Sequence, residues 1–269
     1  MTAVLGTSVS PRSPDYAANR AAMQALVDGL NERQAKARAG GGERGAAKFR
    51  TAGKLLPRER VEWLLDPNTP FLELSSLAAE GMYNGESPGG SQITGIGVVS
   101  GVECLIFVND ATVKGGAVYP MTLQKSLRAQ QIAFENRLPC ISLVESAGAN
   151  LLYQDEVFIL GGRTFANQAR LSAAGIPQVA LVFGSSTAGG AYIPGMSDYV
   201  VMVRERAAVY LGGPPLVRMA IGEEADDETL GGAEMHARVS GVSDYTAEDD
   251  ADALRLGRLI VAQLAQPKP

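Results

Sequence analysis

Short apolar runs alternate with longer segments of helical spacing from about residue 92 to the end of the chain. Two strand-like runs, 93–101 and 102–110, are joined around Gly101 in the manner of a hairpin. Strands that alternate with helices predict an α/β fold. Further strands are expected at 140–146, 178–184, 198–203 and 207–212, and helices at 121–139, 161–177, 189–197 and 247–265.

The N-terminal part has a different pattern. Apolar residues recur at helical spacing from Pro14 to Ala39, and a second helix is expected over 55–67. The glycine-rich stretch between them fits G-x-G-x-x-G, but a helix and not a strand precedes it. We therefore interpret this match as accidental.

Composition excludes several classes of function. The net charge of −5 argues against a general nucleic-acid binder. No apolar run reaches the length of a membrane span, and the N-terminus lacks the pattern of a secretory signal. With one histidine, two cysteines and no C-x-x-C spacing, no metal site is predicted. We interpret Cys104 and Cys140 as buried thiols in a reducing compartment, and expect a cytoplasmic location.

Charge is distributed unevenly along the chain. Residues 20–60 carry ten Lys and Arg against four Asp and Glu, whereas residues 223–252 carry eleven acidic residues against Arg238 alone. Both segments are typical of solvated surface. The alternative for the basic segment is a patch that faces an anion, such as a phosphate-bearing ligand or a partner.

Adjacent glycines follow the apolar run 178–184. Gly189 and Gly190 stand where a strand leads into a helix, and a helix N-terminus offers unpaired N–H groups and the positive end of a dipole. Glycine also lets a ligand atom approach the backbone closely. The pair is therefore predicted to donate hydrogen bonds to an anionic oxygen, and the alternative is close packing or a tight turn.

A second strand, 140–146, also runs into small residues, Ala147 and Gly148. One strand–helix–strand unit separates the two turns, so in a parallel sheet both lie at the carboxyl edge, where α/β folds bind ligands. Two facing sets of amides then hold one oxyanion, and such a donor contributes roughly 2.7–4 kcal/mol in enzymes that use it.

An ordered set of motifs carries a family resemblance. "GKLLPRERVEWLLDP", "NDATVKGGA", "LRAQQIAFENRLPCISLVESAGAN", "STAGGAYIPGMSDYVVMV", "GGPPLV" and "LGGAEMHARVSGV" appear in this order. Together they resemble the N-terminal half of the carboxyltransferase (beta) subunit of biotin-dependent acyl-CoA carboxylases, and the methylcrotonyl-CoA and geranyl-CoA branch more than the propionyl-CoA branch.

The resemblance implies a fold, a cofactor and a mechanism. The fold is the crotonase-like ββα spiral. Carboxybiotin, carried on a partner subunit, releases carbon dioxide, the freed biotin nitrogen deprotonates the acyl-CoA, and the enolate attacks carbon dioxide. The protein then needs no side-chain base, because the cofactor supplies it. Backbone amides hold the enolate oxygen, and the matching residues are Ala147, Gly148, Gly189 and Gly190.

Other positions are assigned to the acyl-CoA. Gly115, Gly116 and Ala117 match a small-residue turn of the family, with plain turn chemistry as the alternative. Ala188 and Ala191 flank the second glycine pair and are also assigned to this ligand. Basic residues in matching segments are expected at the CoA phosphates, unless they serve only as surface or subunit contacts. These are Lys54, Arg58, Arg60 and Lys114.

The family subunit carries a second, similar domain, and the resemblance covers only the first. We assign residues 1–20 to a disordered N-terminus and residues 21–269 to the N-terminal carboxyltransferase domain, with the C-terminal domain absent from this chain. The implied partners are the biotin carboxylase and biotin carrier (alpha) subunit and further beta subunits, with no nucleic acid and no membrane.

Four other functions stay open at this stage. A serine hydrolase is disfavoured, because "GSSTA" lacks the last glycine of G-x-S-x-G and His236, expected in a polar loop, is the only possible base. A hydratase-type crotonase enzyme would use Glu145 or Asp155. A biotin-dependent acyl-CoA decarboxylase would share these motifs, and a non-catalytic assembly half would bind the partner subunit but no CoA ester.

Overall fold

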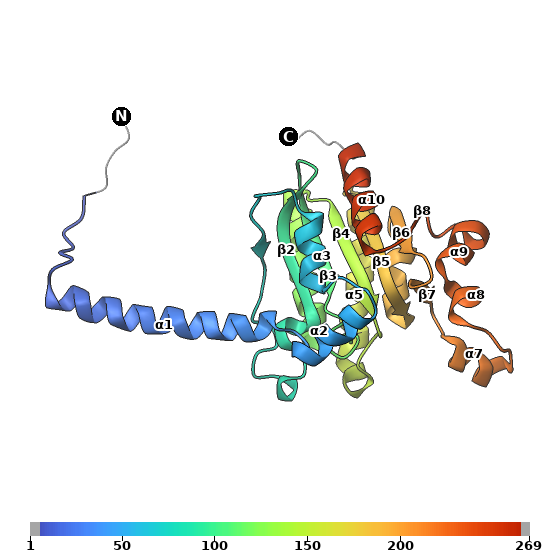
Figure 1. The fold of residues 1–269 in the computed structure, drawn as a ribbon, viewed down its shortest axis with the longest axis horizontal. Coiled ribbons are helices and arrows are strands. Elements are labelled where there is room, and N and C mark those ends of the chain that lie inside the picture. Colours follow the sequence, from blue (N-terminus) through green and yellow to red (C-terminus); the bar gives the residue numbers. More distant parts are fainter. Residues whose placement is uncertain (1–5, 265–269) are drawn as a thin grey trace.

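One mixed sheet organises the chain, and the computed structural model describes residues 6–264 (Figure 1). The strands lie in the order β1-β2-β3-β4-β5-β6-β8. Strand β7 is outside this linear order and pairs with β5. The bounds are β1 Leu72–Glu73, β2 Gln92–Val99, β3 Val102–Asn109, β4 Cys140–Ser146, β5 Gln178–Thr187, β6 Tyr199–Val203, β7 Ala208–Tyr210 and β8 Tyr245–Ala247.

The pairing of neighbouring strands changes from antiparallel to parallel at β3. β1, β2 and β3 are antiparallel, and the predicted hairpin is present, with Val99 paired to Val102. From β3 onward, β3, β4, β5, β6 and β8 are parallel neighbours, and β7 is parallel to β5. The carboxyl ends of these strands therefore point the same way, which places the turns that follow β4 and β5 side by side.

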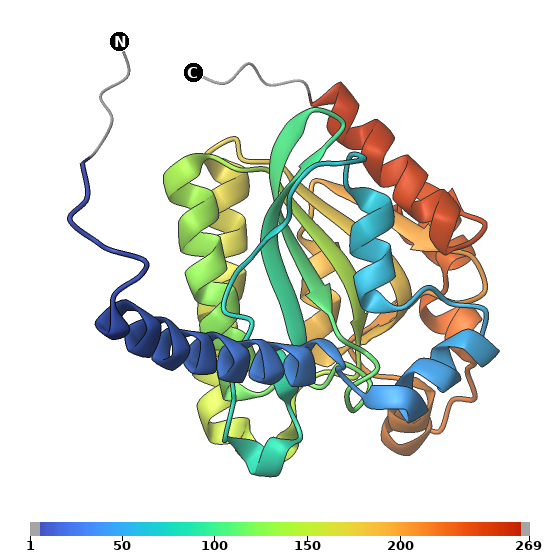
Figure 2. The same ribbon diagram turned by 60° about the vertical axis from the view of Figure 1, so that its left-hand side comes forward.

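Helices cover both faces of the sheet (Figure 2). The long pair α4 and α5 lies on one face, and α3 and α10 lie on the other. The helical bounds are α1 Pro14–Arg38, α2 Gly42–Thr51, α3 Pro57–Leu64, α4 Pro120–Asn136, α5 Gln154–Ala173, α6 Tyr192–Gly195, α7 Pro214–Ile221, α8 Asp227–Gly231, α9 Ala233–Met235 and α10 Asp250–Gln263. Short 3₁₀ turns cover 83–85, 88–91, 151–153 and 188–191, and a π-helical turn covers 236–240.

Each face of the sheet has its own apolar core. Val61 and Leu64 of α3 pack with Leu254 and Ile260 of α10 over one face. On the other face, α4 and α5 bury residues such as Leu171 beneath them. Cys104 and Cys140 are buried, as the sequence predicted, and burial raises the pKa of both thiols to about 12. Both cysteines are therefore thiols at neutral pH.

Several segments differ from the sequence prediction. Helix α5 begins at Gln154, seven residues before the predicted start at residue 161, and so includes two glycines in its interior. Helix α2 occupies part of the glycine-rich break, because Gly40 and Gly42 adopt left-handed φ angles that separate it from α1. His236 was expected in a polar loop but is buried in a π-helical turn.

Helix α1 extends away from the sheet (Figure 1). It begins at Pro14, so residues 14–20, which we had assigned to the disordered N-terminus, are helical. None of its residues is buried, and the predicted apolar positions Met23, Leu26 and Leu30 are exposed. Among residues 6–264 no helix is long and apolar enough to cross a membrane.

A buried arginine fastens the N-terminal helices to the sheet. Arg60 of α3 is fully buried; its guanidinium lies 3.0 Å from Asp250 of α10 and 2.9 Å from Glu145 of β4. The same guanidinium stacks over the Phe183 ring of β5, 4.2 Å from its centroid. One side chain thus joins α3, α10 and two central strands.

Replacing this arginine should cost substantial stability. Arg60→Met leaves Asp250 and Glu145 short of a buried partner, and breaking a buried ion pair typically costs about 3–5 kcal/mol. We expect a loss of about 3 kcal/mol in urea unfolding, because Arg206 and Lys54 still pair with the two carboxylates. The exposed Arg50, paired with Glu59, is the control, and Arg50→Gln should change stability by less than about 1 kcal/mol. Equal losses in both variants would contradict the role of Arg60.

Candidate active site

Three turns meet at the carboxyl edge of the sheet, as the sequence predicted for two of them. Residues 115–118 run beside residues 147–150 through a parallel bridge between Val118 and Ala149. Val118 donates its N–H to the carbonyl of Gly148 at 2.9 Å. The third turn, 188–191, lies against Gly148, since a Cβ at Gly148 would be 3.9 Å from the Ala188 Cβ. Small residues from three loops therefore form one surface.

Two of the four predicted amide donors already have acceptors. Ala147 donates its N–H to the Gly115 carbonyl at 2.9 Å, and Gly148 donates to the Ser146 hydroxyl at 3.1 Å. That hydroxyl in turn donates to the Gly116 carbonyl at 2.9 Å. Ser146, which sequence reasoning missed, thus joins two of the turns. Its place as the last residue of β4 was the only signal in the sequence.

The turn after β5 keeps open donors. Ala188 and Gly189 are the first two residues of a 3₁₀ turn, so their N–H groups have no acceptor within it. Gly190 lies close above the neighbouring strands, because a Cβ there would be 3.1 Å from the Ser186 hydroxyl. Gly189 has room for a Cβ, which would meet only Phe165 at 3.6 Å. Packing therefore explains one glycine of the pair and not the other.

Left-handed backbone is concentrated at these turns. Ala188 has φ 51° and Lys114 has φ 48°, although neither is a glycine. Gly115, Gly116 and Gly148 have φ 67°, 74° and 85°. Non-glycine residues with positive φ are strained, and such strain is typical of functional sites.

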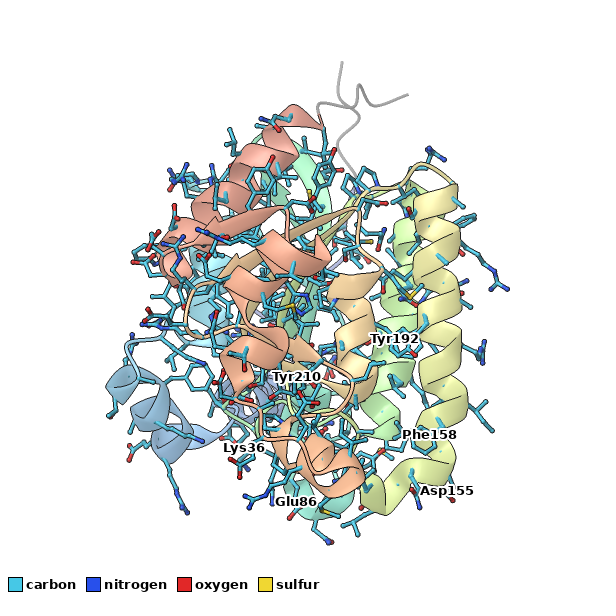
Figure 3. All side chains as sticks on the ribbon, turned by 90° about the vertical axis from the view of Figure 1, so that its right-hand side faces the viewer. Lys36, Glu86, Asp155, Phe158, Tyr192 and Tyr210 are labelled. Atoms are coloured by element: carbon cyan, nitrogen blue, oxygen red, sulfur yellow. The ribbon has the colours of Figure 1, made fainter. Side chains whose placement is uncertain are left out.

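A cavity of about 400 Å³ opens from this surface. It extends between α4, α5 and the sheet, and Ala147, Gly148, Gly189 and Gly190 all line it. Figure 3 labels Phe158 on α5 and Tyr192 at the start of α6, and Phe158 lines the cavity while remaining exposed. The predicted residue Ala188 also lines it, as does Ser146, whereas the predicted residues Gly115, Gly116, Ala117 and Ala191 do not.

No residue with an ionisable side chain lines the cavity within the described part of the chain. Glu145 points to the other face of the sheet, where it pairs with Lys54 and Arg60. Asp155 is exposed at the start of α5. The two acids that a hydratase-type enzyme would need are therefore outside the cavity.

The hydrolase alternative also lacks its base. His236 uses both ring nitrogens, one 2.7 Å from the Val209 carbonyl and the other 2.7 Å from the Ser240 hydroxyl. The Ser186 hydroxyl is buried and has no hydrogen-bond partner. A buried serine without a neighbouring base is not an activated nucleophile.

The basic residues assigned to CoA phosphates are engaged in ion pairs. Lys54 pairs with Glu145 at 2.6 Å, and Arg58 makes two hydrogen bonds to Glu73 at 2.9 and 3.0 Å. Arg60 is buried in the network described above. Lys114 alone of these four is more than half exposed, and it pairs with Glu86 at 3.1 Å next to the Gly115–Gly116 turn.

Comparison with known protein families identifies the family of the chain. The model of the "Carboxyl transferase domain" matches residues 48–269. The chain belongs to the carboxyl transferase domain family. Within this family it is 59% identical over 261 residues to the probable biotin-dependent acyl-coenzyme A carboxylase beta2 subunit of Mycobacterium tuberculosis, covering 97% of the chain and 49% of that relative.

Two further members of the carboxyl transferase family support the resemblance. The biotin-dependent 3-methylcrotonyl-coenzyme A carboxylase beta1 subunit of M. tuberculosis is 58% identical, with 91% of the chain and 47% of the relative covered. The crystal structure of the geranyl-CoA carboxylase beta subunit of P. aeruginosa superposes with a TM-score of 0.87 at 51% identity, covering 96% of the chain and 48% of that structure. The predicted crotonase-like fold is confirmed, and the chain spans about half the length of these relatives.

Gly148 offers a test of the strained site. Its φ of 85° is unfavourable for an L-residue, and a Cβ would also lie 3.4 Å from the Thr187 carbonyl oxygen. Gly148→Ala should lower the free energy of unfolding by about 1–2 kcal/mol. Thermal unfolding measures this change. The control is Gly195→Ala, at a glycine with ordinary φ and open space, which should leave the free energy of unfolding unchanged. A stable Gly148→Ala variant would show that the turn relaxes freely.

Proposed function

We propose that this chain is the acyl-CoA-binding half of a carboxyltransferase that moves a carboxyl group from biotin to an acyl-CoA. The observation that carries the proposal is a cavity whose mouth is built from backbone amides and whose lining holds no ionisable side chain. Such a site stabilises a developing oxyanion but does not move a proton by itself. Its chemistry therefore requires a base brought by another group.

Biotin fits this requirement, because the described residues offer no competing base beside the amides. When bound, biotin supplies the carboxyl group and the basic nitrogen that accepts the substrate proton. The relatives named above are described as biotin-dependent or as acyl-CoA carboxylases, which supports the same assignment. The biotin-carrying subunit and further copies of the beta subunit are the proposed partners, and the cytoplasm is the proposed location.

The protein's own residues then bind and orient the acyl-CoA. The N–H groups of Ala188 and Gly189 hold the thioester oxygen and stabilise the charge that it gains as the enolate forms. Ala147 and Gly148 form the opposite wall, where their own N–H groups are tied to Gly115 and Ser146. The apolar walls exclude water from the enolate.

Calorimetric titration of this chain with acyl-CoA thioesters tests the proposal. We expect saturable binding of 3-methylcrotonyl-CoA and weaker binding of its thioether analogue, which lacks the carbonyl oxygen. Loss of the hydrogen bonds from Ala188 and Gly189 predicts a difference of at least about tenfold. Failure of every CoA thioester to bind would overturn the assignment of the acyl-CoA site to this half.

The cavity also limits the size of the acyl group. Part of its polar lining is hydrogen-bonded within the protein: Gln92 accepts from Ser126 at 2.8 Å, and Gln168 donates to the Ile193 carbonyl at 2.9 Å. The buried Oε1 of Gln130, which also lines the cavity, has no hydrogen-bond partner among the described residues. The cavity of about 400 Å³ is larger than a five-carbon acyl chain needs. We infer that it can accommodate an apolar acyl chain of more than five carbons.

Two glycines in α5 keep this space open. Gly161 and Gly162 line the cavity, and a Cβ at either would meet nothing within 4 Å. Neither has positive φ, so neither turn geometry nor close packing requires glycine. Glycine in a helix interior lowers helix stability by about 1 kcal/mol relative to alanine. We infer that glycine is present at these two positions because a side chain there would fill the cavity.

Filling the cavity from Gly161 should discriminate between acyl chains. Gly161→Leu is expected to weaken binding of a ten-carbon acyl-CoA at least tenfold and to leave propionyl-CoA within twofold, because only the long chain reaches that wall. Gly29→Leu, at an open glycine of α1 far from the cavity, is the control. Equal losses for short and long chains would place the acyl group elsewhere.

A further inference from the structure

The connection between β1 and β2 has an unusual backbone. Residues 75–91 leave the sheet, make two 3₁₀ turns and return. Many of these residues adopt left-handed backbone conformations, namely Ser75, Ala79, Gly81, Tyr83, Asn84, Gly85, Gly89, Gly90 and Ser91. Left-handed conformations are costly in non-glycine residues, so other contacts must hold the segment in place.

The end of this segment that enters β2 is fixed to α4. Buried Lys125 donates to the carbonyls of Gly89 at 2.9 Å and Gln92 at 2.6 Å, and Thr122 donates to the Gly90 carbonyl at 2.7 Å. Burial lowers the pKa of Lys125 to about 8. Buried hydrogen bonds of this kind make the end near α4 a rigid anchor.

The tip of the segment, residues 83–86, reaches the site. The Tyr83 ring lies 4.8 Å from that of Tyr119 and 5.0 Å from that of Tyr153, which directly precedes α5. The Tyr83 hydroxyl accepts the N–H of Met121 at 3.2 Å. The tip therefore bridges the starts of both helices that enclose the cavity.

Glu86 completes the contact with the site. Its carboxylate pairs with Lys114 at 3.1 Å and accepts from the Tyr119 hydroxyl at 3.4 Å. Lys114 immediately precedes the Gly115–Gly116 turn and has the strained φ of 48°. Both partners are about half exposed, at 55% and 45%, so an incoming anion can reach the lysine.

We propose that residues 83–86 form a latch in which Glu86 occupies Lys114 until a phosphate-bearing ligand displaces it. Exposed ion pairs contribute little stability, whereas a phosphate carries more charge than one carboxylate and competes effectively for the same ammonium. Displacement releases Glu86 and loosens the tip at that contact, while the Tyr83 contacts and the anchor at Lys125 retain the rest of the segment. The identity of the ligand as CoA rests on the proposed function.

The latch predicts that removing the Glu86 carboxylate increases the affinity of the chain for CoA. Glu86→Gln should bind CoA about threefold more tightly than wild type at low salt, and this difference should disappear at high salt. Glu80→Gln is the matched control: it removes the same charge from the same segment, but Glu80 pairs with Arg33 of α1. Lys114→Met should weaken CoA binding, and adding Glu86→Gln to Lys114→Met should cause no further change in affinity. Calorimetric titration measures wild type, the three single variants and this double variant.

Hydrogen exchange of the ligand-free chain tests the latch without CoA. Residues 83–86 should exchange about threefold faster in Glu86→Gln and Lys114→Met than in wild type and Glu80→Gln. Faster exchange without binding of any CoA compound would retain the latch and overturn the proposed function. Unchanged exchange, or equal CoA affinity of Glu86→Gln and wild type, would overturn the latch.

Discussion

The buried Arg60 guanidinium is the interaction on which the rest of the arrangement depends. It holds Asp250 at the start of the last helix and Glu145 in the strand that ends at the site, and it lies on the Phe183 ring of the next strand. The residue after Glu145 is Ser146, whose hydroxyl joins the turns. A charge network on one face of the sheet thus fixes the strand ends that carry the ligand surface on the other.

The separation of charged side chains from the cavity explains why the candidate site consists mainly of backbone amide groups. Side chains alternate along a strand, so Glu145 and Ser146 face opposite sides of the sheet. The charged residues stabilise the far face, and the described residues that line the cavity are small, apolar or neutral polar, with no ionisable side chain among them. Amide groups held by a rigid sheet stabilise an oxyanion without reorganisation, which suits a reaction whose base arrives on a cofactor.

Under the proposed function, the cavity and the 75–91 segment both contribute to selectivity. Gly161 and Gly162 leave space where most helices would place side chains. The Tyr83–Tyr153 contact and the Glu86–Lys114 pair close the outer end of the same helices. Under the proposed function, acyl length and the anionic part of the ligand are therefore recognised by different segments of the chain.

The sequence by itself determined the α/β alternation, the hairpin and the two small-residue turns, because hydrophobic periodicity and glycine placement are local signals. The ordered motifs also determined the family. Tertiary structure decided which amides stay open: Ala147 and Gly148 are engaged by Gly115 and Ser146, whereas Ala188 and Gly189 are the first two residues of a 3₁₀ turn. It also paired Lys54 and Arg58 with carboxylates and showed that α5 encloses a cavity. Hydrogen bonds and ion pairs between distant segments depend on how the strands align in space, and no local pattern in the chain encodes that alignment.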